Sequence, residues 1–137
     1  MRRQTKDDHT MNNTLRRTVI GAALLAACAV SAPVPAAQAV TKCTDIGNGQ
    51  LCMLANAGNP ATASYRKDAG GEVTVRLGFQ VKGASPVHWD AGFFKAYVRA
   101  EPWYYTWRDN GVSKGVSYRA VLHQYGGNTW YSAWATP

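Results

Sequence analysis

The chain has 137 residues, with 15 Lys and Arg against 8 Asp and Glu and a formal net charge of +7. Five of the basic and two of the acidic residues precede Val40, so residues 40–137 carry a net charge of +4, with no basic run longer than the pair Arg66-Lys67. This dispersed charge argues against a nucleic-acid site, and an aromatic-rich, Gly-rich, Leu-poor composition argues against a helical bundle.

The N-terminal region has the three parts of a secretory signal peptide in the right order. An arginine pair, Arg16-Arg17, gives a positive segment, an apolar run over residues 19–30 follows, and small residues from Ala37 to Ala39 form a cleavage site. We therefore predict a signal peptide over residues 1–39 and one secreted domain over residues 40–137.

Three other interpretations of this region stay open. Met11 begins a complete signal peptide by itself, so the residues before it would be an upstream extension. The arginine pair also fits a twin-arginine export signal. The sequence LLAAC, which ends at Cys28, resembles a bacterial lipobox, in which the cysteine is lipidated and becomes the first mature residue. The protein would then be anchored on the outer face of the membrane, which is the one membrane association we expect.

The chain contains three cysteines, Cys28, Cys43 and Cys52. Cleavage or lipidation removes Cys28 from the thiol pool, which leaves Cys43 and Cys52 to pair in an oxidising compartment. Between them, Gly47-Asn48-Gly49 supplies residues that tolerate positive φ, so the chain can reverse there. We predict a Cys43–Cys52 disulfide across a hairpin, with a structural role and no redox or metal role.

Period-two alternation identifies the clearest strand. In EVTVRLGFQVKG, apolar residues occupy every second position from Val73 to Val81, which predicts a strand over residues 72–82 with one face in water. A turn signal at Asp68–Gly71 precedes it, so we predict a hairpin between residues 63–67 and this strand. Upstream, QLCMLANAGNP predicts a short strand that ends at Gly58-Asn59-Pro60.

Two aromatic segments follow in the chain. HWDAGFFKAYVRAEP fits a strand better than the short helix that Asp90 would cap, because aromatic and β-branched residues dominate it. WYYTWRDNG predicts a strand with Trp103, Tyr105 and Trp107 on one face, followed by a turn at Asp109–Gly111.

Two further strands complete the pattern. GVSYRAVLHQYGG predicts one of them, and NTWYSAWATP predicts the last, with Trp130 and Trp134 on the same face. About seven short strands separated by Gly, Asn, Asp and Pro predict an all-β fold. We expect a small β-sandwich or barrel of antiparallel strands with one disulfide.

Short stretches of the sequence resemble known families. DNGVSK, residues 109–114, is similar to the calcium-binding stretch of βγ-crystallin modules, with Lys114 in place of a serine. LCMLANAG, followed by a tyrosine-bearing strand, is similar to small crystallin-like secreted antifungal proteins. The layout of an alanine-rich signal peptide and a stapled β domain resembles small exported proteins of high-GC Gram-positive bacteria. These resemblances imply export and a β fold, and we carry over no site residue from them.

Residues 40–137 contain no complete catalytic or metal-binding motif. GxSxG, HExxH and P-loop motifs are absent from the sequence. His88 and Asp90 would point the same way in an extended segment, and His123 or Asp109 would have to complete a hydrolase site. We therefore expect no enzyme activity, no catalytic residue, no metal and no cofactor, with a compact hydrolase that uses His88, Asp90 and His123 as an alternative.

Aromatic residues give the strongest indication of function. Five Trp, seven Tyr and three Phe all lie after Val40. Tyr104 alternates with Trp103 and Tyr105, so one aromatic face of that strand would be exposed unless a second layer covers it. The same rings would otherwise fill the core of a Leu-poor domain. The predicted binding residues are Trp103, Tyr104, Tyr105, Trp107, Trp130 and Trp134.

We expect a secreted, monomeric, non-catalytic binding protein. Exposed Trp and Tyr can stack on sugar rings, and a net positive charge favours anionic surfaces. The expected partner is an extracellular polysaccharide or cell-envelope polymer, or another secreted protein, and not nucleic acid. A small secreted antimicrobial toxin or enzyme inhibitor is the alternative.

Overall fold

The computed structural model describes residues 38–137, which form nine antiparallel strands and no helix. The strands are β1 (Val40–Asp45), β2 (Gly49–Ala55), β3 (Pro60–Lys67), β4 (Val73–Val81), β5 (Val87–Trp89), β6 (Phe94–Ala96), β7 (Trp103–Gly111), β8 (Tyr118–Gln124) and β9 (Thr129–Tyr131). The predicted signal peptide lies outside the described residues except for its last two positions, and so do Met11 and Cys28.

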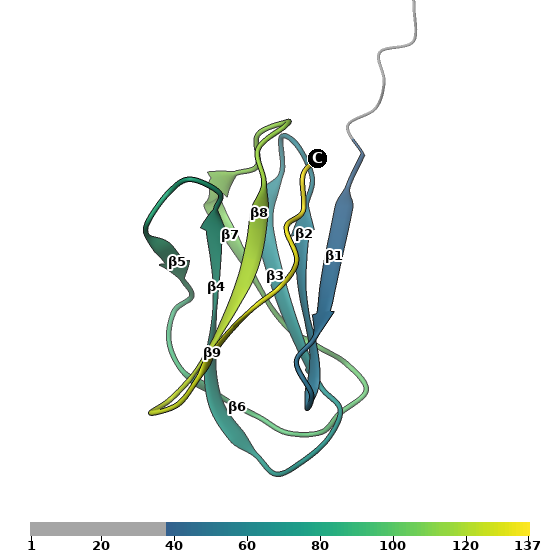
Figure 1. Cartoon of the computed structure of the whole chain (residues 1–137), viewed down its shortest axis with the longest axis vertical. Coiled ribbons are helices and arrows are strands. Elements are labelled where there is room, and N and C mark those ends of the chain that lie inside the picture. The colour runs from purple at the N-terminus through teal and green to yellow at the C-terminus, as the bar shows by residue number, and fades with distance from the viewer. Residues whose placement is uncertain (1–37) are drawn as a thin grey trace, which may run out of the picture. The chain divides into compact units, whose positions relative to one another are not determined.

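The strands form two sheets that pack face to face (Figure 1). One sheet has four strands in the order β1-β2-β3-β7. The other has five strands, in the order β5-β4-β8-β9 with β6 paired to β4. The sheets do not close into a barrel, so the sandwich-like alternative of the all-β prediction is confirmed.

Alternating side chains build the core between the two sheets. On β4, Val75, Leu77 and Phe79 are buried, as the period-two pattern predicted. Leu51 of β2 and Tyr65 of β3 are fully buried on the facing sheet. Side chains at the intervening positions therefore point away from the core, and they form the two outer faces of the sandwich.

The β1–β2 hairpin confirms the disulfide prediction. Cys43 and Cys52 are direct partners in the strand register and are covalently bonded. Gly47 takes a φ of 89° in the turn, and its amide donates to Asp45 Oδ1 (2.7 Å). Cys52 follows the buried Leu51, so the disulfide lies on the outer face of the four-stranded sheet.

The predicted hairpin between residues 63–67 and 72–82 is wrong. These residues belong to β3 and β4, which lie in different sheets: β3 pairs with β2 and β7, whereas β4 pairs with β5, β6 and β8. The chain crosses between the sheets through Asp68–Glu72. A Gly-rich turn signal marks a change of direction, but it does not determine which sheet receives the next strand.

The predicted turn at Asp109–Gly111 is also wrong, because β7 continues through Gly111. The β3–β7 register jumps there, from Ala61 opposite Trp107 to Pro60 opposite Gly111. The turn-forming residues are therefore taken up as a bulge inside the strand. In residues 88–102, for which the sequence allowed a strand or a short helix, no helix forms, and only β5 and β6 are strands.

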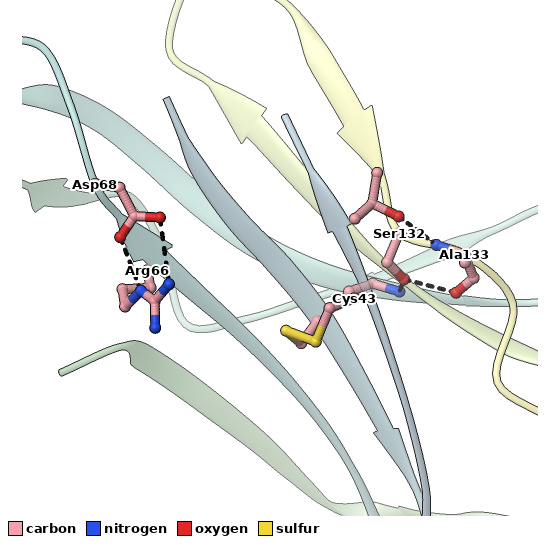
Figure 2. Close-up of a disulfide and its surroundings, with 8 residues drawn as sticks. Cys43, Arg66, Asp68, Ser132 and Ala133 are labelled. Atoms are coloured by element: carbon pink, nitrogen blue, oxygen red, sulfur yellow. Dashed lines mark hydrogen bonds and ion pairs between the residues drawn. A yellow bond between two sulfur atoms is a disulfide. The ribbon is translucent and has the colours of Figure 1, made fainter. Parts of the chain in front are cut away.

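Two hydrogen bonds connect the sheets at opposite edges of the sandwich. At one edge, Trp107 Nε1 of β7 donates to the carbonyl oxygen of Trp89 in β5 (3.1 Å). At the other, the C-terminal segment after β9 runs to β1 (Figure 1), where the amide of Ala133 donates to Thr44 Oγ1 (2.8 Å). Figure 2 shows Ser132 and Ala133 beside the disulfide strand.

Candidate binding surface

Four of the six predicted binding residues face the core. Trp107 is buried, and Trp103, Tyr105 and Trp130 are half-buried and pack against the core. Trp103, Tyr105 and Trp107 therefore share one face, as their spacing predicted, and that face is the inner one. Their rings contribute to the packing between the two sheets, where each buried aromatic removes about 150–250 Å² from water.

Trp103 also forms a cation–π contact with Arg99, which donates hydrogen bonds to backbone carbonyl groups. The Arg99 guanidinium lies 3.8 Å above the ring of Trp103. Its Nε donates to the carbonyl oxygen of Glu101 (2.8 Å) and its Nη2 to that of Pro102 (3.1 Å). This cation–π pair and these two hydrogen bonds fix the loop between β6 and β7.

Tyr104 lies on the outer face of the four-stranded sheet and is 73% exposed. Its register partner is Ser64, and on the same face the hydroxyls of Thr62 and Thr106 share a hydrogen bond (2.9 Å). A groove of about 510 Å³ follows β7 from Tyr104 to Asn110. Tyr104 is thus an isolated exposed ring among short polar side chains.

Trp134 faces the outside of the five-stranded sheet, so the prediction that it shares a face with Trp130 is wrong. Trp130 pairs with the buried Leu122 and points inward. At Ser132 the regular pairing ends, because the amide of Ala120 donates to Ser132 Oγ (2.8 Å). The next bridge joins Ala135 to Tyr118, so four residues after Tyr131 match three on β8. This extra residue reverses the side-chain alternation.

The strand register places a continuous set of aromatic and basic side chains on the outer face of the five-stranded sheet. Arg76 lies between the buried Val75 and Leu77 and so points outward. The central row across β5, β4, β8 and β9 is Trp89, Gly78, Val121 and Tyr131. We call the whole surface the platform: Arg76, Trp89, Phe93, Arg119, His123, Tyr125, Tyr131 and Trp134.

Arg76 organises the first half of the platform. Its guanidinium carbon lies 3.9 Å from the ring centre of Trp89 and 5.2 Å from that of Phe93. Phe93 makes an edge contact with Tyr125 (5.3 Å), and the ring of His123 lies 6.0 Å from both Trp89 and Phe93. Phe93 and Tyr125 are 41% and 71% exposed, so this cluster faces water.

Arg119 organises the second half. Its guanidinium carbon lies 4.0 Å from the ring centre of Tyr131 and 4.6 Å from that of Trp134. Its Nε and Nη2 both donate to Gln80 Oε1, at 3.0 and 2.7 Å. One side of the guanidinium is thereby fixed, and the remaining N–H donors are available to a ligand.

Gly78 lets Trp89 lie against the sheet. A Cβ at this position would come 2.7 Å from Val87 Cγ1 and 2.8 Å from Trp89 Cε3. Because real Cβ atoms do not approach so closely, any side chain here would displace β5 and the indole. The glycine inside the strand is therefore required by the packing of the platform.

Asp90 borders the platform but does not neutralise Arg76 through an ion pair. Its Oδ2 accepts from the Leu77 amide (3.0 Å) and its Oδ1 from the Gly92 amide (3.1 Å). Burial raises the pKa of Asp90, against the lowering effects of these two hydrogen bonds and of the Arg76 charge. The carboxylate therefore accepts hydrogen bonds from backbone amides, one of which connects the end of β5 to β4.

The residues of the hydrolase alternative do not assemble. His88 stacks on the inward-facing Phe79 (4.6 Å), whereas His123 pairs with Arg76 on the outer face, where its Nδ1 bonds Thr129 Oγ1 (2.8 Å). The two imidazoles therefore lie on opposite faces of one sheet. Within residues 38–137 no group of three or more His, Cys, Asp or Glu side chains is arranged to hold a metal ion.

Most platform residues were missed in the sequence, although a signal for some of them was present. The alternation that buries Val75 and Leu77 also places Arg76 outward, and Arg119 occupies the equivalent outward position beside buried Tyr118 and Ala120. Only the register between strands brings these arginines over aromatic rings from β5, β9 and the segment after β9.

No family model matches the chain, and comparisons with curated proteins and with solved structures give no significant match. In the part of the chain that the structure describes, no helix is long and apolar enough to cross a membrane.

Proposed function

We propose that the protein is a secreted, non-catalytic binding protein for an extracellular polysaccharide or cell-envelope polymer, and that the platform is its binding surface. The observation that carries this proposal is the gathering of aromatic and arginine side chains on the solvent side of one sheet. A separate set of aromatic residues already fills the core. The outer side chains cover the fully buried Val121, but Phe93, Tyr125 and Tyr131 stay exposed, and packing does not account for their exposure.

The form of the surface favours an extended ligand. Exposed rings on the platform come from the loop after β5, the β8–β9 turn and β9 itself, and they extend across the sheet. Aromatic faces supply apolar contact area at a low cost in side-chain entropy, and the adjacent arginines supply hydrogen-bond donors. A polymer can contact several such points at once, whereas a small ligand would need a concave pocket.

The disulfide supports the extracellular part of the proposal. Structural disulfides form and persist in oxidising compartments. Cys43 and Cys52 are bonded on an outer face of the domain. This agrees with the signal peptide predicted from the first 39 residues.

Retention on polymers tests the proposal. The protein is incubated with insoluble cellulose, chitin and bacterial cell wall, and in affinity gels that contain soluble acidic polysaccharides, and the bound fraction is measured. Tyr131→Ala removes a platform ring that is 42% exposed. We expect about a tenfold loss of affinity for whichever polymer is retained, equivalent to about 1.4 kcal/mol.

Tyr104→Ala is the matched control, since it removes an exposed tyrosine from the opposite outer face. It should bind as the wild type does. Failure of every polymer to retain the wild-type protein would overturn the proposal, and equal losses in the two variants would remove the platform from it.

A further inference from the structure

We infer that the polymer is an acidic polysaccharide whose anionic groups are held by Arg76 and Arg119. This inference rests on the proposed function and specifies the chemical class of its ligand. It is drawn from the hydrogen bonding of the two guanidinium groups and from their spacing on the sheet.

Arg76 presents donors that the protein leaves unused. Its Nε is the one buried side-chain nitrogen or oxygen among the described residues that has no hydrogen-bond partner, so the protein itself does not hold the guanidinium through that atom. A ligand would meet the two terminal Nη groups, which no described side chain or carbonyl group engages. The guanidinium carbon lies 3.9 Å from the ring centre of Trp89, and this cation–π contact restrains the position of the group without any ligand. A carboxylate, sulfate or phosphate that accepts two N–H bonds from such a planar group forms one of the stronger hydrogen-bonded pairs in proteins.

Asp90 does not supply that anion through an ion pair. Asp90 influences Arg76 electrostatically, but both of its carboxylate oxygens accept backbone amides. The two ion pairs found in residues 38–137 involve other basic residues: Asp68 pairs with Arg66, and Glu72 pairs with Lys95. The positive charge of Arg76 is therefore uncompensated by an ion pair within residues 38–137.

Arg119 gives the second anchor at a defined distance. It is the register partner of Gln80, and Gln80 lies four residues beyond Arg76 on β4. At a rise of about 3.3 Å per residue, the two arginine positions are about 13 Å apart along the strands. The row of Trp89, Val121 and Tyr131 lies between them. This spacing of two cationic groups fits a chain with repeated negative charges, and it does not fit one small anion.

The same chemistry could attract single-stranded nucleic acid, in which bases stack on aromatic side chains. Two observations favour the sugar polymer. The rings beneath the two arginines are occupied by their guanidinium groups, so the free ring area is small and divided. The disulfide also points to a compartment outside the cell.

Matched polymers test the inference. Affinity gels contain polygalacturonate, its methyl-esterified form or neither, with a thymidine oligonucleotide as a separate probe, at equal and low salt. We expect at least tenfold tighter binding to polygalacturonate than to the ester, and a steep loss of binding as salt is raised. Arg76→Gln and Arg119→Gln should each weaken binding about tenfold, and the double variant about a hundredfold, because the positions are too far apart to couple.

Arg108→Gln is the charge-matched control, since Arg108 is exposed in the bulge of β7, away from the platform. It should bind as the wild type does. Arg76→Lys keeps the charge but loses the planar fork, and should fall between wild type and Arg76→Gln. Thermal unfolding of each variant verifies that it is folded, and Arg76→Lys and Arg108→Gln keep the test decisive if one glutamine variant does not fold.

The outcomes separate the two proposals. Equal binding to polygalacturonate and to its ester, or unchanged binding in the arginine variants, overturns the acidic ligand and leaves the polymer-binding function standing. Tighter binding to the oligonucleotide than to polygalacturonate also overturns the inference. If neither these probes nor cellulose, chitin and cell wall are retained, both proposals fall together.

Discussion

The two outer faces of this sandwich carry different kinds of side chains. On the four-stranded sheet, Tyr104 is an exposed ring, but the outward side chains around it are short or already paired. The pairs are a disulfide between Cys43 and Cys52 and an ion pair between Arg66 and Asp68 (Figure 2), and a hydrogen bond between Thr62 and Thr106. On the five-stranded sheet, the outward side chains are large aromatic rings and arginines.

The contrast is clearest in the arginines. Arg66 donates through Nε to Asp68 Oδ1 (2.8 Å), and this hydrogen bond raises the pKa of Arg66. Arg76 stacks on Trp89 but its Nε has no partner. Under the proposed function, the unused donors of the platform bind a ligand, whereas the mutually paired groups of the other face contribute to stability. Stability and binding should therefore be separable by face.

The largest effect should come from removing the disulfide. The Cys43→Ser, Cys52→Ser double variant releases a loop that spans a sequence separation of 9 residues, and we expect it to lower the free energy of unfolding by about 2–3 kcal/mol. Urea unfolding followed by tryptophan fluorescence measures the change. Because the bond lies on the face opposite the platform, polymer affinity at a temperature where the variant is folded should not change.

A parallel loss of polymer affinity in the folded double variant would contradict the separation of the two faces. Reduction of the wild-type protein under the same conditions serves as a control, since it breaks the same bond without changing the sequence.

A smaller loss of stability, with a loss of binding, is expected from Gly78→Ala. The added Cβ would press on Val87 and Trp89, and overpacking of this kind costs about 1–3 kcal/mol. Displacement of the indole also removes the surface on which Arg76 stacks, so polymer affinity should fall with stability. Denaturant unfolding and affinity gels measure the two effects.

Gly71→Ala is the control for this change, since a Cβ there meets no atom within 4 Å. It should leave both measurements unchanged. An unaltered polymer affinity in a folded Gly78→Ala variant would show that binding by the platform does not depend on the position of the Trp89 indole.

Local sequence predicted those parts of the fold that depend on local physics. Alternation located β4 and assigned Val75, Leu77 and Phe79 to the core, and the Gly47–Gly49 turn placed the cysteines opposite each other. Both depend on the geometry of one strand or one turn. The hairpin assigned to residues 63–82 was wrong because the choice between the two sheets is made by long-range packing.

The candidate site was harder to predict for the same reason. Alternation showed that Trp103 and Tyr105 share a face, but it does not reveal whether that face is the core. Trp134 reaches the outer face only because Ser132 bonds the distant amide of Ala120, which introduces an extra residue into the pairing. Sequence spacing cannot contain that information, since the bond partner lies on another strand.

The smallest effect tests whether the polar groups on the inner face of the four-stranded sheet are also hydrogen-bonded. Tyr65 is fully buried, and its hydroxyl donates to Asn48 Oδ1 (3.1 Å) in the β1–β2 turn. Burial raises the pKa of Tyr65 above the ordinary value of 10.0, and the nearby Asp68 adds to this. Tyr65→Phe removes one buried hydrogen bond, so it should lower the free energy of unfolding by about 1 kcal/mol at neutral pH.

The pH dependence gives this prediction its sign. The phenol of the unfolded chain ionises near pH 10.0, before that of the folded protein, so the contribution of Tyr65 to stability is complete below that pH and is lost as pH rises through the higher folded pKa. The difference between wild type and Tyr65→Phe should therefore narrow above pH 10 in urea unfolding curves. Asn48→Ala, which removes the acceptor but keeps the phenol, should lose a similar amount at neutral pH and decline at alkaline pH alongside the wild type. The difference in free energy of unfolding between wild type and Tyr65→Phe could instead stay constant from neutral to alkaline pH, which would mean that burial does not raise the pKa of the Tyr65 hydroxyl. The contrast between a sheet with paired polar groups and a platform with unpaired donors would then hold only for the outer faces.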